Sequence, residues 1–69
     1  MKLKHIAKDT LVPTGKIYDV RVRCKTFIDG KNYLQLTIPN FVMDDGLIVT
    51  YHEHYDTLKD LAEHWEVPN

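Results

Sequence analysis

Hydrophobic and polar residues alternate over residues 17–25 of this 69-residue chain, with Ile17 as the one apolar residue among the polar positions. The even positions of this stretch carry Tyr18, Val20, Val22 and Cys24. The odd positions carry Ile17, Asp19, Arg21, Arg23 and Lys25. A period of two, with β-branched and aromatic residues on one side, is typical of a strand with one buried and one hydrated face. The pattern therefore predicts a strand in which Cys24 is a buried, inert side chain rather than a nucleophile.

A second alternating stretch, YLQLTI (33–38), places Leu34, Leu36 and Ile38 on one side. Asp29-Gly30, which separates the two stretches, is a favoured hairpin turn. Pro39 is expected to end regular pairing or to restrict it to a sheet edge. Beyond it, FVM, the turn DDG and LIVTYH predict a second hairpin. LVPTG (11–15) predicts a loop, and the alternating KLKHI near the N-terminus predicts a short first strand.

The hydrophobic period changes after residue 56. Apolar side chains recur there at the helical spacing i, i+3, i+4 and i+7, at Leu58, Leu61, Ala62 and Trp65. This spacing predicts a helix over about residues 57–66, with Trp65 in the core. Thr57, followed three residues later by Asp60, approximates a capping box, and Pro68 closes the segment. A helix of about three turns must dock on the sheet to persist.

These elements predict one α+β domain covering residues 1–69. The expected architecture is a small antiparallel sheet of four to five strands within about residues 2–52, followed by the C-terminal helix. A chain this short buries only about 60% of the surface that its unfolded form exposes. We expect the sheet to curl into a partly closed SH3-like barrel, because closure reduces the number of exposed edges.

The order of a short strand, a loop ending in TGKIYDV, a DDG turn and LIVTYH resembles the small SH3-like barrels of uncharacterised phage and bacterial proteins. The resemblance covers most of residues 1–55. The chain differs from that pattern in its long Asp29-Gly30 hairpin and in its well-formed helix at 57–66. The resemblance implies a fold and a phage origin, and it carries no catalytic residues over to this chain.

The cysteine content and the lengths of the apolar runs bear on the cellular compartment and on possible cofactors. Cys24 is the single cysteine, so the chain forms no internal disulfide and has no thiol pair to anchor zinc. This usage fits a reducing compartment. No apolar run approaches the roughly 7–15 residues of a signal peptide or the roughly 20 of a membrane-spanning helix. We therefore expect a cytoplasmic protein with no membrane association and no cofactor.

The stretch TYHEHYDTL contains the one concentration of chemically reactive side chains. On a strand, His52 and His54 point to the same side, about 7 Å apart. A metal would need a third ligand, for which the candidates are His5, Asp44, Asp45 and His64. An acid–base pair of His52 with Glu53 or Asp56 is the catalytic alternative. No second ligand pair, catalytic motif or phosphate loop accompanies these residues. The sequence therefore favours the interpretation that they are the polar end of a strand before the helix begins. It predicts neither a metal site nor an enzyme.

Charge is divided unequally along the chain. Residues 1–35 contain eight basic and three acidic residues, a net charge of +5. Residues 36–69 contain one lysine and seven acidic residues, a net charge of −6. A split of this kind bears on partners rather than on the fold.

The charge split defines two candidate surfaces. The first hypothesis is a protein-binding module, and the resemblance adds the idea of a phage-encoded regulator or inhibitor of a host protein. Its acidic surface would comprise Asp44, Asp45, Asp56, Asp60, Glu63 and Glu66. The alternative is a nucleic-acid-binding β-barrel, in which cations hold phosphates and an aromatic ring holds bases. That surface would comprise Arg21, Arg23, Lys25, Lys31 and Tyr33. A homo-oligomer, basic half against acidic half, is a third alternative.

Overall fold

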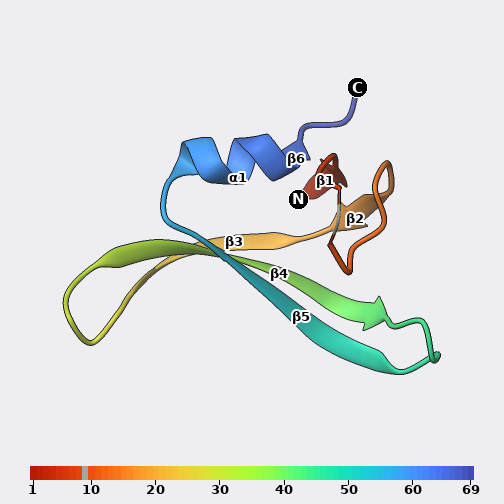
Figure 1. Cartoon of the computed structure of the whole chain (residues 1–69), viewed down its shortest axis with the longest axis horizontal. Helices are drawn as coiled ribbons and strands as arrows, with labels where there is room; N and C mark the ends of the chain where they lie inside the picture. Colours follow the sequence, from red (N-terminus) through yellow and green to blue (C-terminus); the bar gives the residue numbers. More distant parts are fainter. Residues whose placement is uncertain (9) are drawn as a thin grey trace.

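The computed structural model describes residues 1–8 and 10–69, over which the chain forms six strands and one short helix (Figure 1). In chain order these are β1 (Lys2–His5), β2 (Ile17–Asp19), β3 (Arg21–Thr26), β4 (Asn32–Val42), β5 (Ile48–Tyr55), α1 (Leu58–His64) and β6 (Trp65–Glu66). Within these residues, no helix has the length and apolar character needed to cross a membrane. The predicted α+β class with a C-terminal helix is confirmed.

The strands form two three-stranded antiparallel sheets, in the orders β2–β1–β6 and β3–β4–β5. The expected single sheet of four to five strands is therefore not found, and the two sheets described do not close into a barrel. The alternating stretch 17–25 is divided at Val20, whose side chain is buried in the core. The chain passes from one sheet to the other at this residue.

Strand β4 is the centre of the larger sheet and is longer than the sequence predicted. It pairs with β3 on one side and with β5 on the other. The β4–β5 pairing is interrupted between Ile38 and Phe41, where Asn40 has a left-handed φ of 57°. This irregularity lets the strand continue past Pro39 instead of ending there, because a bulge tolerates the missing proline N–H. Phe41 and Val42 of the FVM segment are thus the end of β4 and not a separate strand.

The core lies between the two sheets and α1. The inward face of β4 supplies Leu36 and Ile38, as the alternation predicted. The other buried apolar side chains are Leu3, Val12, Val20, Phe41, Tyr55, Leu61 and Trp65. His5 is also fully buried, and neither of its ring nitrogens has a hydrogen-bond partner among the described residues. Its ring packs edge-on against Trp65, with 4.7 Å between the ring centroids.

Helix α1 begins where the sequence predicted and ends earlier. Thr57 is the N-cap, and its Oγ1 accepts a hydrogen bond from the backbone N–H of Asp60 at 3.1 Å. The helix stops at His64, because Trp65 adopts an extended backbone and pairs with His5 of β1. The predicted end at residue 66 is therefore wrong. Of the predicted apolar stripe, Leu61 and Trp65 are buried, whereas Leu58 is 71% exposed.

Cys24 is exposed, so the prediction that it is buried is wrong. It lies on the inward side of β3, opposite Leu34, which is itself only half-buried. The β3–β4 hairpin projects beyond α1 (Figure 1), and β3 is an edge strand of its sheet. Alternation thus identified the side of the strand correctly but not the extent of the core.

Candidate nucleic-acid interface

The face of the β3–β4–β5 sheet turned away from the core carries a row of basic and polar side chains. Strand pairing places Arg21, Thr37 and His52 side by side, and Arg23, Gln35 and His54 in the next row. Lys25 lies opposite Tyr33 in the third row. We call this surface the outer sheet face, and it comprises Arg21, Arg23, Lys25, Tyr33, Gln35, Thr37, Thr50, His52 and His54.

Hydrogen bonds across the strands hold the two imidazoles of this face. Thr37 Oγ1 and His52 Nδ1 are 2.9 Å apart and share a hydrogen bond. Gln35 Nε2 lies 3.4 Å from His54 Nε2, at the long end of the range for a hydrogen bond. Both rings therefore contact β4, whose other neighbour is the arginine-bearing strand β3, and they extend the polar surface to the third strand.

A shallow cleft of about 240 Å³ runs over the outer sheet face. It is lined by Arg21, Arg23, Lys25, Gln35, Thr37, Thr50 and His52. None of these lining side chains is a carboxylate, and three of them are permanently cationic. A surface of this composition attracts anions, and its flatness suits an extended polymer better than a small molecule.

Aromatic rings gather at the hairpin end of the same face. The rings of Phe27 and Tyr33 are stacked, with 4.2 Å between centroids and an interplanar angle of 25°. The ring of His54 lies 4.9 Å from that of Tyr33, at an interplanar angle of 52°. Lys31 and Phe27 line an adjacent open cleft of about 600 Å³, together with Ile28, Asp29 and Asp56.

The structure thus brings together four of the five residues predicted for the basic surface, with Lys31 at its hairpin end. Sequence reasoning did not assign His52 and His54 to this surface, because it treated them as a possible metal pair. The strand period predicts only that His52 and His54 share one side of β5. The register of β4 with β5 places that side on the same sheet face as the arginines, with β4 between them.

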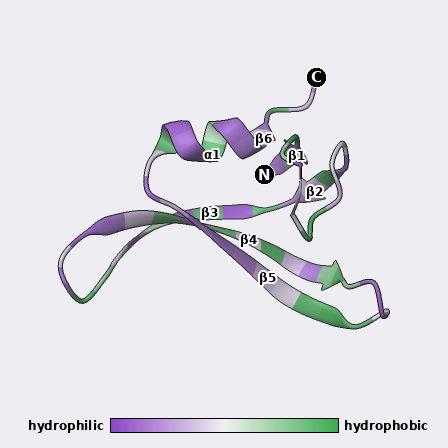
Figure 2. Cartoon of the chain, viewed as in Figure 1, coloured by the Kyte–Doolittle hydropathy of each residue, from purple (hydrophilic) through white to green (hydrophobic). Residues whose placement is uncertain are grey.

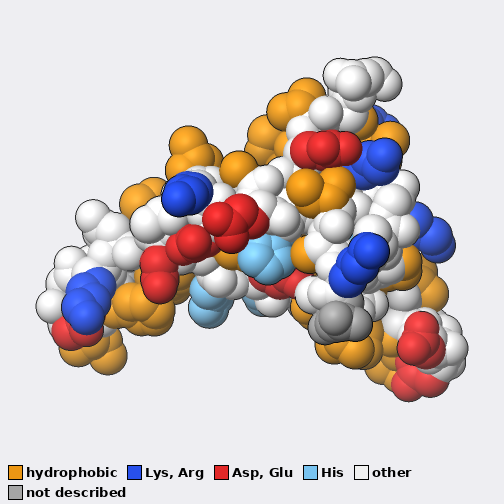
Figure 3. Space-filling view, turned by 45° about the horizontal axis from the view of Figure 1, so that its top comes forward, with side chains coloured by type: hydrophobic (Ala, Val, Ile, Leu, Met, Phe, Trp, Pro, Cys, Tyr) orange, Lys and Arg blue, Asp and Glu red, His pale blue; other side chains and the backbone are white. Residues whose placement is uncertain are grey.

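The six predicted acidic residues do not form one surface. Asp44 and Asp45 lie in the β4–β5 turn, at the far end of the molecule from α1 (Figure 1). Glu66 of β6 pairs with Lys4 at 3.9 Å. Asp56, Asp60 and Glu63 lie in or next to α1. The space-filling view likewise shows acidic side chains in separate groups (Figure 3).

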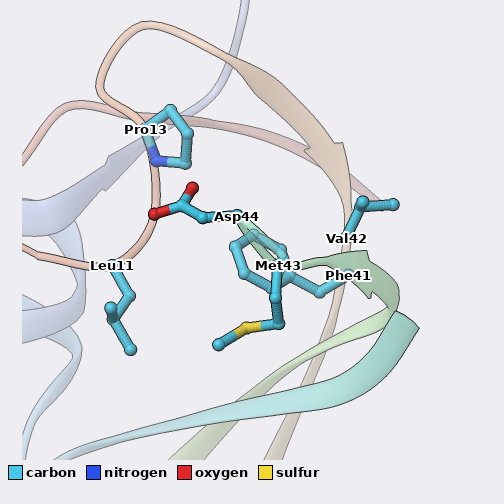
Figure 4. A pocket seen from close by; sticks show the side chains of 6 residues that line it. All are labelled: Leu11, Pro13, Phe41, Val42, Met43 and Asp44. Carbon is cyan, nitrogen blue, oxygen red and sulfur yellow. The ribbon is translucent and has the colours of Figure 1, made fainter. Parts of the chain in front are cut away.

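Asp44 lies beside the β1–β2 loop rather than near the helix. Its carboxylate is close to Pro13, across from the end of β4, in the small cleft of Figure 4. That cleft has a volume of about 30 Å³ and is lined mainly by apolar side chains. A space of this size holds about one water molecule. It is too small to bind a ligand.

Within the part of the chain that the structure describes, the histidine pair gains no third ligand for a metal. Among residues 1–8 and 10–69, no group of three or more histidine, cysteine, aspartate or glutamate side chains is placed to hold an ion. His52 and Glu53 also point to opposite faces of β5, so they cannot act as an acid–base pair. Figure 2 shows β5 as hydrophobic at the end next to the β4–β5 turn and hydrophilic toward α1.

Glu53 belongs instead to a hydrogen-bonded cluster on the core side of β5. Its carboxylate accepts hydrogen bonds from the hydroxyls of Tyr51 (3.0 Å) and Tyr55, and from Trp65 Nε1 (3.3 Å). Burial, together with the nearby Glu53 charge, raises the pKa of Tyr51 to about 12. Burial and then the Glu53 hydrogen bond raise the pKa of Tyr55 well above its usual value. The cluster ties β5 to β6 and does not open onto the outer sheet face.

No protein-family model, curated protein or solved structure matches this chain. Its candidate surfaces are therefore defined by their own chemistry. Of these surfaces, the outer sheet face gathers the most side chains of one character in one place.

Proposed function

We propose that this protein is a non-enzymatic binding module that holds nucleic acid on its outer sheet face. The observation that carries the proposal is the carboxylate-free cleft in which Arg21, Arg23 and Lys25 lie side by side along β3. Arginine and lysine side chains supply most contacts to the phosphate backbone, and they release condensed counterions when they bind. A cytoplasmic location is part of this proposal, because the single cysteine fits a reducing compartment.

The overall charge of −1 does not oppose this function. Charges separated by more than about 10 Å of solvent are largely screened at an ionic strength of 0.1 M. Helix α1, with Asp60 and Glu63, lies on the other side of the sheet, because its Leu61 packs in the core with Leu36. A phosphate on the outer sheet face is therefore attracted by the local basic side chains more strongly than it is repelled by the distant carboxylates.

The proposal also includes a more specific description of the fold than two sheets and a helix. We propose that the two sheets are the halves of a partly closed SH3-like barrel. In support, Val20 alone separates β2 of one sheet from β3 of the other, so a single bent segment joins them. Small barrels commonly present one sheet face to single strands of nucleic acid.

The proposal is tested by measuring the fluorescence anisotropy of a labelled oligothymidylate during titration with the protein. The Arg21→Glu, Arg23→Glu double variant is compared with wild type at several salt concentrations. Each phosphate contact contributes about −0.7 to the slope of log affinity against log salt for a single strand, so the variant should lose about 1.4 of that slope. Lys59→Glu, an exposed change on α1, is the matched control and should bind as wild type. Unaltered binding by the double variant would refute the proposal.

A protein partner for α1 is a second candidate function. Asp56, Asp60 and Glu63 lie together around a helix on which Leu58 is 71% exposed, and such a surface suits a basic partner with an apolar contact. This is the part of the larger predicted acidic surface that lies in or next to α1. Asp60→Lys with Glu63→Lys should slow association with such a partner, and the effect should shrink as salt rises. A host protein as that partner rests on the phage resemblance alone.

A further inference from the structure

Three rings lie at the hairpin end of the outer sheet face, where no packing requirement of the core places them. Tyr33 is on the side of β4 opposite to Leu34 and Leu36, and Phe27 is 46% exposed. The rings contact one another, with centroid distances of 4.2 Å from Tyr33 to Phe27 and 4.9 Å from Tyr33 to His54. They form a small aromatic platform raised on the surface.

We propose that the ring cluster of Phe27, Tyr33 and His54 stacks on unpaired bases, so that the ligand of the outer sheet face is single-stranded nucleic acid. This inference rests on the proposed function and specifies its substrate class. Bases in a duplex are already stacked on their neighbours and expose only their edges in the grooves. A flat ring on a sheet surface reaches a base face only when the strand is unpaired.

Rings and cations are arranged so that one nucleic-acid strand can contact both. Lys25 lies directly opposite Tyr33 in the β3–β4 ladder, and Arg23 lies opposite Gln35 in the next row of this face. The cations are therefore on the β3 side and the rings of Tyr33 and His54 on the β4 and β5 side. A single strand lying along β3 would place its phosphates against the cations and turn its bases toward the rings.

Two carboxylates set the boundary of this site. Asp29 and Asp56 line the open cleft beyond Phe27, together with Lys31 and Ile28. Asp29 is engaged in its own turn, where its Oδ1 accepts a hydrogen bond from the Lys31 backbone N–H at 3.0 Å. Asp56 is exposed, and its charge would repel a phosphate that strayed from the β3 side. Asp56→Asn should therefore strengthen oligonucleotide binding.

Three ligands of equal length separate base stacking from phosphate binding: an oligothymidylate, the same backbone with abasic sites, and a duplex. A base stacked on an aromatic ring contributes about five- to 150-fold in affinity. Wild type should therefore bind oligothymidylate at least about fivefold more tightly than the abasic strand. Tyr33→Leu should reduce this ratio to near one, and Tyr33→Phe should retain it. The far-ultraviolet circular dichroism spectrum of Tyr33→Leu, compared with that of wild type, shows whether the variant is folded.

The outcomes distinguish this inference from the proposed function. If wild type binds all three ligands with equal affinity, phosphate binding stands and the base-stacking site is wrong. If it binds none of them at low salt, the proposed function fails. A preference for oligothymidylate that persists in Tyr33→Leu and in a Phe27→Leu, His54→Ala variant would also overturn the inference, because the bases would then be held elsewhere.

Discussion

Replacing Trp65 by alanine should come close to unfolding the protein. Trp65 is 2% exposed, and its ring lies 4.7 Å from His5 and 6.2 Å from Tyr18 between centroids. Its Nε1 donates a hydrogen bond to the Tyr55 hydroxyl at 3.0 Å. This one side chain therefore joins β1, β2 and β5 to the end of α1.

The magnitude follows from the cavity that the ring would leave. Truncation of a buried tryptophan to alanine costs about 3–5 kcal/mol. A domain is stable by about 0.05–0.15 kcal/mol per residue, which for 69 residues is about 3.5–10 kcal/mol. The variant should thus lose between a third and all of its free energy of unfolding.

The assay is urea denaturation followed by far-ultraviolet circular dichroism, because the variant has no tryptophan fluorescence. Trp65→Phe should lose less stability than Trp65→Ala, since it keeps an aromatic ring and loses the indole N–H. Leu58→Ala is the control on the same helix, and its cost should stay within about 0.5 kcal/mol because Leu58 is exposed. A loss below about 1 kcal/mol in Trp65→Ala would refute the central position of Trp65 in the core.

Three further predictions concern alkaline pH, thiol reactivity and the buried imidazole. The pKa of Tyr51 is raised to about 12 and that of Tyr55 is raised too, so the neutral phenols favour the folded state. The free energy of unfolding should be highest below pH about 10, the pKa of tyrosine in the unfolded chain, and should fall as the pH rises toward 12. A series of urea melts at different pH values measures this, and a flat profile would contradict it. Cys24 should react with a thiol reagent in native buffer about as fast as in urea, and strong protection would place it back in the core. His5→Leu should leave the stability unchanged or raise it in thermal melts, because it removes two buried nitrogens that have no hydrogen-bond partner among the described residues. A loss of several kcal/mol would contradict this and would reveal a partner for the ring.

Local sequence patterns predicted the elements of the fold well. The alternation at residues 33–38 identified Leu36 and Ile38 as core residues, and the Asp29-Gly30 turn lies between β3 and β4. Thr57 caps α1 as its side-chain chemistry indicated. These predictions succeeded because each depends on a few neighbouring residues.

The assembly of these elements could not be read in the same way. Whether Cys24 is covered depends on how far the core extends along β3, which no local pattern encodes. Trp65 continues the helical period, yet it pairs with β1 because a partner distant in sequence is available there. Pro39 does not end β4, because a bulge at the following residue restores the pairing.

The candidate site shows the same division. The period of two is enough to predict that Arg21, Arg23 and Lys25 share one face of a strand. Their neighbours His52 and His54 come from a strand about 30 residues later, and only the register of β4 with β5 brings them across. The predicted acidic surface is not formed for the converse reason. Its residues share a negative charge, but they lie at opposite ends of the molecule.

Mapping the binding surface by nuclear magnetic resonance tests the proposed function most directly. Amide resonances of the isotopically labelled wild-type protein are followed while a short oligothymidylate is added at low salt. Residues in β3, in β4 at 33–37 and in β5 at 50–54 should shift, while α1 and the β4–β5 turn stay unchanged. The absence of any shift, or shifts confined to α1 or to that turn, would contradict nucleic-acid binding on the outer sheet face.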